Sequence, residues 1–125
     1  MSKGELMVNA SPDNFRADFF RVLAHPLRIR ILRLLRSGEK SVSQLQTELG
    51  TESSRVSQHL QALRANYLLS SRRQGTAVFY AIRDPEIFMI LDAARNIFER
   101  SVSDSRGTLE LLDEEEQKLA RSAEQ

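Results

Sequence analysis

The sequence predicts a mainly α-helical fold that carries one β-hairpin, an α+β arrangement. Apolar residues recur at helical spacing through most of the chain, whereas on both sides of Gly75 the period changes to two. A length of 125 residues suits one domain, with little left for a second. The content of 41% hydrophobic and 28% charged residues is typical of a globular protein.

The first two helices are predicted at residues 13–24 and from Pro26 onward. Ser11 is a candidate N-cap, and Pro12 fits the first turn of the first helix. The proline at position 26 opens the second helix in the same way, and Gly38 is its natural stop.

The next two helices are joined by a tight turn. Ser41 and Gln44 have the spacing of a capping box, which opens a short helix that Gly50 closes. A longer helix is predicted over residues 53–66. Its core-facing side has apolar residues at spacings of four and three, namely Val56, Leu60 and Leu63. Two helices joined by a turn with glycine form a helix-turn-helix.

Two strands are predicted at residues 68–73 and 77–83, around a turn at Gln74-Gly75-Thr76. Glycine supplies the positive φ that tight hairpins need. Asp84 and Pro85 then cap a further helix with a wide apolar face. The segment 106–122 is either a short amphipathic helix or a frayed acidic tail. A helix-turn-helix followed by a basic hairpin is the plan of a winged helix.

Charge is distributed unevenly along the chain. Residues 1–83 hold thirteen basic and six acidic residues, a balance of +7, whereas residues 84–125 hold five and eleven, a balance of −6. Eleven of the thirteen basic residues are arginines, which suit phosphate and guanine contacts. A basic body favours a polyanionic partner such as nucleic acid, and a solvated surface is the simpler alternative.

Several classes of protein are disfavoured by composition. With no cysteine and two histidines, the chain has no thiolate nucleophile, disulfide or cysteine-ligated metal, and we expect no cofactor. The sequence shows no nucleophile–base pair and no glycine-rich phosphate loop, so we expect that the protein is not an enzyme. No apolar run approaches the roughly 20 residues that cross a bilayer, and the N-terminus has no secretion signal. We therefore expect a cytoplasmic protein without a membrane segment.

Three stretches carry a family pattern. They are LAHPLRIRILRLL at Leu23–Leu35, SSRVSQHLQALRANYLL at Ser53–Leu69 and RRQGTAVFYAI at Arg72–Ile82. In this order and spacing they resemble the ArsR/SmtB family of bacterial winged-helix repressors. The similarity covers about residues 13–100. It implies a homodimeric transcriptional regulator that blocks promoters by binding a pseudo-palindromic operator.

The resemblance implies that helix 53–66 enters the major groove of DNA. With its apolar residues inward, the helix turns polar side chains outward, among them Arg55 and Gln58. Arginine can bind guanine and glutamine can bind adenine through paired hydrogen bonds. The candidate DNA-binding residues are Ser53, Ser54, Arg55, Ser57, Gln58, His59, Gln61, Arg72, Arg73 and Gln74.

Four of the basic positions have a structural interpretation. His59 either lies near the DNA backbone or packs within the protein, and His25 is expected to mark a helix entry. Arg72 and Arg73 are expected to contact phosphate or the minor groove. Their alternative role is to protect the edge of the hairpin from pairing with another strand.

The sequence does not identify the signal that such a regulator senses. Many relatives bind metals through a Cys-x-Cys motif, where this chain has Ser41 and Ser43, and hydroxyls are poor ligands for soft metals. A site made only of carboxylates such as Asp84, Asp92 and Glu99 is less expected than a solvated charged face. We predict no metal site and leave the effector unknown.

The resemblance also implies a dimer built on the first helix and the helix after the hairpin. Their apolar residues exceed the needs of one small core, and such a surplus normally marks a partner. The predicted interface residues are Phe15, Phe19, Ile87, Phe88, Ile90, Leu91, Ile97 and Phe98.

The sequence thus predicts a flexible arm over residues 1–12, a DNA-binding and dimerisation domain over 13–103, and an acidic C-terminal helix or tail over 104–125. Two alternatives remain to a ligand-controlled repressor. One is a DNA-binding regulator without a ligand, and the other is a winged-helix module that binds an acidic protein.

Overall fold

The computed structural model describes residues 11–123 of the chain. These residues form two compact units, 11–85 and 86–123. The predicted N-terminal arm lies almost wholly outside the described residues, although Pro12 already belongs to a helix.

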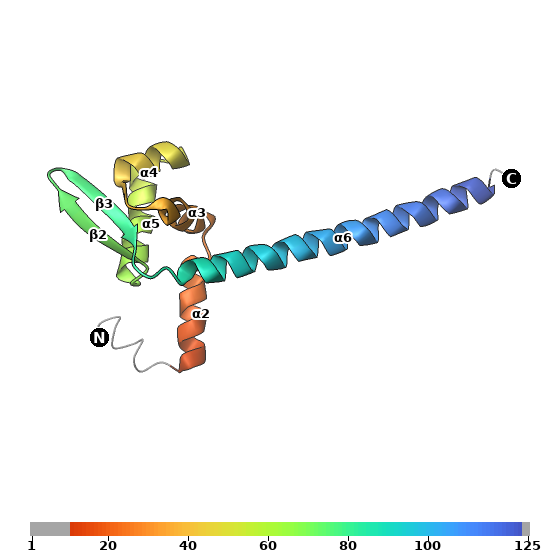
Figure 1. Cartoon of the computed structure of the whole chain (residues 1–125), viewed down its shortest axis with the longest axis horizontal. Coiled ribbons are helices and arrows are strands. Elements are labelled where there is room, and N and C mark those ends of the chain that lie inside the picture. Colours follow the sequence, from red (N-terminus) through yellow and green to blue (C-terminus); the bar gives the residue numbers. More distant parts are fainter. Residues whose placement is uncertain (1–10, 124–125) are drawn as a thin grey trace. The chain divides into compact units, whose positions relative to one another are not determined.

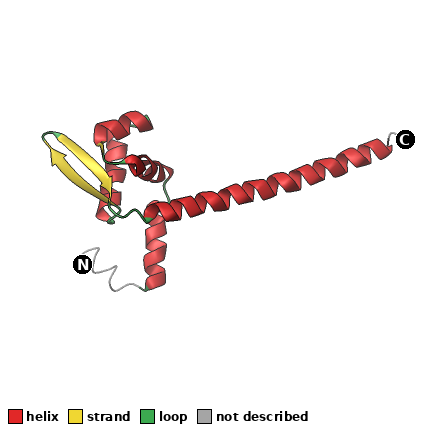
Figure 2. Cartoon of the chain, viewed as in Figure 1, coloured by secondary structure: helices red, strands yellow, loops and turns green. Residues whose placement is uncertain are grey.

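The first unit contains helices and a small sheet (Figures 1 and 2). In chain order its elements are α2 (Pro12–Leu23), α3 (Pro26–Leu34), the 3-10 turn η1 (Leu35–Ser37), β1 (Lys40–Ser41), α4 (Val42–Leu49), α5 (Ser53–Ala65), β2 (Leu69–Gln74) and β3 (Ala77–Ile82). Helices α4 and α5 form the helix-turn-helix, and β2 and β3 form the hairpin that we call the wing. The predicted winged helix-turn-helix fold is confirmed.

Local sequence determines where these helices begin and end. The Ser11 side chain accepts a hydrogen bond from the Asn14 amide and so caps α2. Ser41 and Gln44 form the predicted capping box of α4. That helix ends at Gly50, whose φ of 61° lies in the left-handed region that glycine adopts without strain.

The sheet has a third strand that the sequence did not predict. Its order is β1-β3-β2, with Lys40 opposite Tyr80 and Ser41 opposite Phe79. A strand of two polar residues is too short to show alternation, and Ser41 already belongs to a cap pattern. The predicted hairpin is confirmed, with Arg73 opposite Val78 and a turn at Gly75, where φ is 62°.

The core of the first unit lies between the helices and one face of the sheet. Val56, Leu60 and Leu63 of α5 are fully buried, as predicted. They share the interior with Leu23, Ile31, Leu32, Leu35, Leu45, Leu49, Leu68, Leu69 and Tyr80. This packing fixes which face of α5 turns toward solvent.

The second unit is one helix, α6, which runs from Ile87 to Ala123 over 37 residues. Residues 106–122, for which a short amphipathic helix and a frayed acidic tail were the alternatives, continue this same helix. Ser101 and Thr108 donate hydrogen bonds to the carbonyls of Ile97 and Asp104, one turn back, and so fit within the helix. A single glycine at position 107 costs only about 1 kcal/mol in a helix. Within the described range, no helix combines the length and apolar character needed to span a membrane.

Candidate nucleic-acid interface

Helix α5 presents a polar face to solvent because its apolar face is committed to the core. Ser54, Arg55, Gln58 and Gln61 are exposed, and Ser57 is half-buried. Within the part of the chain that the structure describes, no hydrogen bond or ion pair engages the Arg55 guanidinium. Its donors are therefore available to an external acceptor.

The start of α5 is fixed to the preceding helix. The side-chain amide of Gln46, in α4, donates to Oγ of Ser53 at 2.6 Å. This contact and the left-handed turn at Gly50 set the angle between the two helices. Ser53 is exposed, but its hydroxyl already has a partner in the protein.

His59 belongs to a polar cluster on the half-buried side of α5. Nδ1 of His59 accepts a hydrogen bond of 3.0 Å from Nε of Arg28, and a second Arg28 nitrogen donates to the Val22 carbonyl. The ring of His25 lies 5.6 Å away. Arg28 therefore connects α2, α3 and α5, and His59 has the packed role that was one of its two predicted alternatives. His25 stands at the N-cap position of α3, as expected.

This cluster makes the charged form of His59 unfavourable. Its pKa lies below the ordinary value of 6.5, first because burial disfavours the imidazolium and then because Arg28, His25 and Arg55 add positive charge. Nδ1 accepts a hydrogen bond, so the neutral ring carries its proton on Nε2.

The two arginines of the wing have different surroundings. Arg72 makes a bidentate pair with the carboxylate of Glu39, at 2.7 and 2.6 Å, and donates to Gln74 at 2.9 Å. Its guanidinium also lies 4.5 Å from the centre of the Phe79 ring. The hydrogen bond from Arg72 holds the pKa of the Glu39 carboxyl below its ordinary value of 4.5.

Arg73 lies on the other face of the hairpin, since neighbouring strand residues point to opposite faces. That face also carries the buried Leu69 and Tyr80 and is the one that packs on the helices. Among residues 11–123, no hydrogen bond or ion pair engages the Arg73 guanidinium. Arg73 is thus the wing arginine with free donors.

Comparison with known proteins assigns the family. Residues 25–71 match the model of the arsR family of bacterial regulatory proteins. The HTH-type transcriptional regulator Rv0081 of Mycobacterium tuberculosis is 44% identical over 98 residues, which cover 78% of this chain and 86% of the relative. This chain belongs to the arsR family. The family consists of transcriptional regulators rather than enzymes, and the chain is a DNA-binding regulator of this kind.

Solved structures agree with the assignment. The crystal structure of Rv0081 has a TM-score of 0.68 and 42% identity, covering 76% of this chain and 97% of that one. The solution structure of the homodimeric winged helix-turn-helix DNA-binding domain Mb0332 from Mycobacterium bovis has a TM-score of 0.59 and 30% identity, covering 66% and 77%. The probable mercury resistance operon repressor of Streptomyces lividans is 34% identical and covers 63% of each chain.

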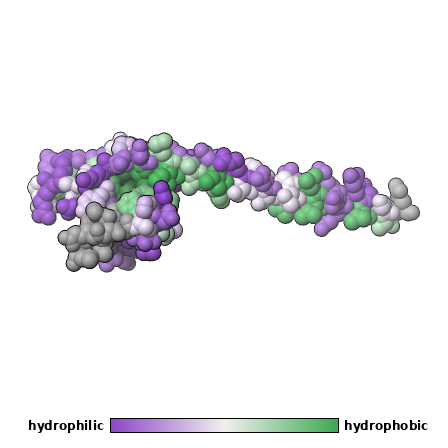
Figure 3. Space-filling view, turned by 90° about the horizontal axis from the view of Figure 1, so that it is seen from below, coloured by the Kyte–Doolittle hydropathy of each residue, from purple (hydrophilic) through white to green (hydrophobic). Residues whose placement is uncertain are grey.

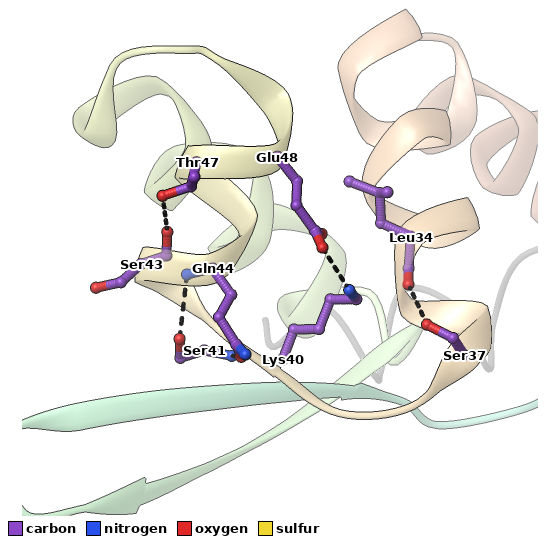
Figure 4. Close-up of polar contacts among 8 residues, drawn as sticks. All are labelled: Leu34, Ser37, Lys40, Ser41, Ser43, Gln44, Thr47 and Glu48. Carbon is purple, nitrogen blue, oxygen red and sulfur yellow. Dashed lines mark hydrogen bonds and ion pairs between the residues drawn. The ribbon is translucent and has the colours of Figure 1, made fainter.

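In this arsR-family chain, one of the two serines that stand where many relatives have metal-binding cysteines has a structural role for its side chain. The Ser41 hydroxyl caps α4 (Figure 4). At Ser43 it is the backbone carbonyl that accepts a hydrogen bond from Thr47, a contact that does not depend on the serine side chain. Across residues 11–123, no three histidine or acidic side chains lie together in a way that could hold a metal ion.

The residues predicted for dimer contacts differ in exposure. Phe15, Ile90, Ile97 and Phe98 are exposed, and Phe19, Phe88 and Leu91 are half-buried. Ile87 is only 3% exposed within a single chain, so it has little surface to offer a partner. Sequence reasoning missed the exposed Phe20 and Met89. Apolar residues also form separate patches along α6 (Figure 3).

Two functional candidates escaped sequence reasoning altogether. Glu39 and Arg28 position Arg72 and His59, but they lie 33 and 31 residues away from these partners in the chain. No local pattern could have paired them.

Proposed function

We propose that this protein is a homodimeric repressor that binds a pseudo-palindromic operator in double-stranded DNA. The observation that carries the proposal is the outward face of α5. There Ser54, Arg55, Gln58 and Gln61 are exposed on a helix whose opposite face is fully buried. A rigid helix with a free polar face has the geometry that reads base edges in the major groove.

Each side chain has a distinct proposed role. Arg55 binds guanine O6 and N7, and Gln58 binds the N6 and N7 groups of adenine. Ser54 and the first amides of α5 bind phosphate, which favours the N-terminus of a helix. Arg73 contributes a phosphate or minor-groove contact from the wing. The remaining proposed contacts are those of Ser53, Ser57, Gln61 and Gln74. His59 and Arg72, which are hydrogen-bonded to Arg28 and Glu39, are proposed to support this surface from within the protein.

The exposed apolar residues of α2 and α6 support a dimer. Phe98 is 66% exposed in the single chain, and burying such residues against a second copy removes apolar surface from water. The homodimeric relative from M. bovis supports the same state. A two-fold dimer places its two recognition helices about one turn of DNA apart, roughly 34 Å.

Repression is supported by the repressor from S. lividans among the relatives. A dimer on an operator blocks a promoter without any chemistry of its own. We propose that the signal, where one exists, is neither a thiol-ligated metal nor the oxidation of a thiol, since the chain has no cysteine.

Selection from a pool of random duplexes, followed by fluorescence anisotropy, tests the proposal. The protein should enrich a pseudo-palindrome and bind it at least about a thousandfold more tightly than a scrambled duplex. Equal, weak binding to both duplexes would contradict the proposal and favour an acidic protein partner. Release by added Zn²⁺ would contradict the expected absence of metal sensing.

A further inference from the structure

The outer face of the sheet carries an ion pair that spans all three strands. Glu39 directly precedes β1 at one edge, and Arg72 lies in β2 at the other edge. The two side chains meet over β3, where the Arg72 guanidinium stacks on Phe79. Both side chains remain partly exposed, at 50% for Arg72 and 35% for Glu39.

The next two residues of the chain connect the same edge to the helix-turn-helix. Nζ of Lys40 pairs with Glu48 of α4 at 2.7 Å, and Ser41 caps α4 (Figure 4). Three consecutive residues therefore join the wing to the first helix of the DNA-binding motif. The pair between Glu39 and Arg72 thus adds a side-chain contact to the backbone pairing of β1 with β3, which also connects the wing to this edge.

We propose that Glu39 is a positioning residue for DNA binding. Its bidentate pair with Arg72 holds the wing in place, so that Arg73, and not Arg72, makes the DNA contact. The inference rests on the proposed function, because it concerns the same DNA-binding surface.

The arrangement of donors supports this division of roles. Three of the five N–H donors of Arg72 already point to Glu39 and Gln74, and the Glu39 carboxylate offsets the positive charge that would attract a phosphate. Isolated surface pairs contribute little, whereas a bidentate pair that also stacks on an aromatic ring fixes a geometry. Arg73, on the face that packs on α5, has no such partner within the described residues.

For the affinity of Glu39→Gln for DNA, the proposal predicts a change opposite to the one that charge repulsion alone would cause. Removing a negative charge near DNA should tighten binding if the charge merely repels phosphate. If Glu39 positions the wing, Glu39→Gln should instead weaken binding about tenfold, within the range of coupling between contacting residues. Arg72→Gln should weaken binding to the same extent, and the double variant should be no weaker than either single one.

The measurement is anisotropy on the duplex that the wild-type protein selects, at several salt concentrations. Arg72→Lys keeps the charge but loses the bidentate fork, so it should bind as weakly as Arg72→Gln. The dependence on salt should stay that of the wild type in all four variants. Glu52→Gln, which removes an exposed carboxylate at the start of α5, is the control and should bind as tightly as the wild type or more tightly.

Hydrogen exchange supplies a readout of wing position that does not depend on DNA. Amides of residues 70–80 should exchange faster in Glu39→Gln, while those of α3 and the unfolding temperature change little. Binding by Glu39→Gln that equals or exceeds the wild type overturns the inference. So does a salt slope that falls by about one in Arg72→Gln, since that marks a lost phosphate contact. A wild type that prefers no duplex contradicts the proposed function instead.

Discussion

At the scale of single residues, Arg55 is the side chain that we propose reads the DNA sequence most directly. It is exposed on the outer face of α5 and makes no hydrogen bond or ion pair within residues 11–123. Arg55→Ala should reduce the preference for the selected duplex, because a bidentate arginine–guanine pair is worth about 1–3 kcal/mol of discrimination. Anisotropy on selected and scrambled duplexes gives the ratio. Equal losses on both would show that Arg55 does not read bases.

Arg73 should behave differently. A phosphate contact carries no sequence information, so Arg73→Ala should weaken binding to all duplexes alike. The slope of log affinity against log salt should also fall by about one. An unchanged slope would place Arg73 away from the phosphates.

His59 should make stability depend on pH. Its pKa is lowered in the folded protein, so the unfolded chain binds a proton more readily. The stability that the neutral ring contributes is complete above about pH 6.5 and decreases as the pH falls below that value. Urea unfolding at pH 7.5 and 5.5 measures the free energy of unfolding that is lost at the lower pH. This loss should be smaller for His59→Gln, which keeps an acceptor for Arg28, than for the wild type. Identical losses in both proteins would assign the effect to other groups.

The sequence showed which residues of α5 face the core and which face solvent, because helical spacing separates an inward from an outward face. The hydrogen-bond partners of His59 and Arg72 were not predictable. Their partners, Arg28 and Glu39, approach only once α3 has packed on α5 and β1 has joined the sheet. A local pattern cannot show contacts that depend on tertiary structure.

At the scale of elements, caps and turns were the most reliable signals. Ser11, Ser41 and Gly50 all take the roles that their positions predict. Strand β1 was missed because two residues show no period. The continuity of α6 was not predicted because residues 99–108 hold a single large apolar residue, Val102. In that section, the hydroxyls of Ser101 and Thr108 donate hydrogen bonds to backbone carbonyls one turn back.

The same substitution at two glycines should have opposite effects on stability. Gly50 has a φ of 61°, so Gly50→Ala should cost about 1–2 kcal/mol although nothing lies within 4 Å of the added methyl group. Gly107 is helical and equally open, so Gly107→Ala should add about 0.5–1 kcal/mol. Urea unfolding of both variants measures the difference. A stabilised Gly50→Ala would contradict the left-handed turn between α4 and α5.

At the scale of the whole molecule, the exposed apolar residues of α2 and α6 predict association. Light scattering at micromolar concentration should give twice the 14.3 kDa of one chain. Phe98→Asp should shift the mass toward one chain, since burying an unpaired charge in an apolar interface is costly. Glu99→Gln, on the same turn of α6, is the matched control. A wild-type mass of one chain would contradict the dimer.

The central claim is sequence-specific binding to duplex DNA, and one measurement tests it most directly. Fluorescence anisotropy of the wild-type protein compares the selected duplex with a scrambled one at two salt concentrations. We predict a preference of at least about a thousandfold, with affinity that falls steeply as salt increases. Equal affinity for both duplexes, or affinity that does not change with salt, would contradict the account.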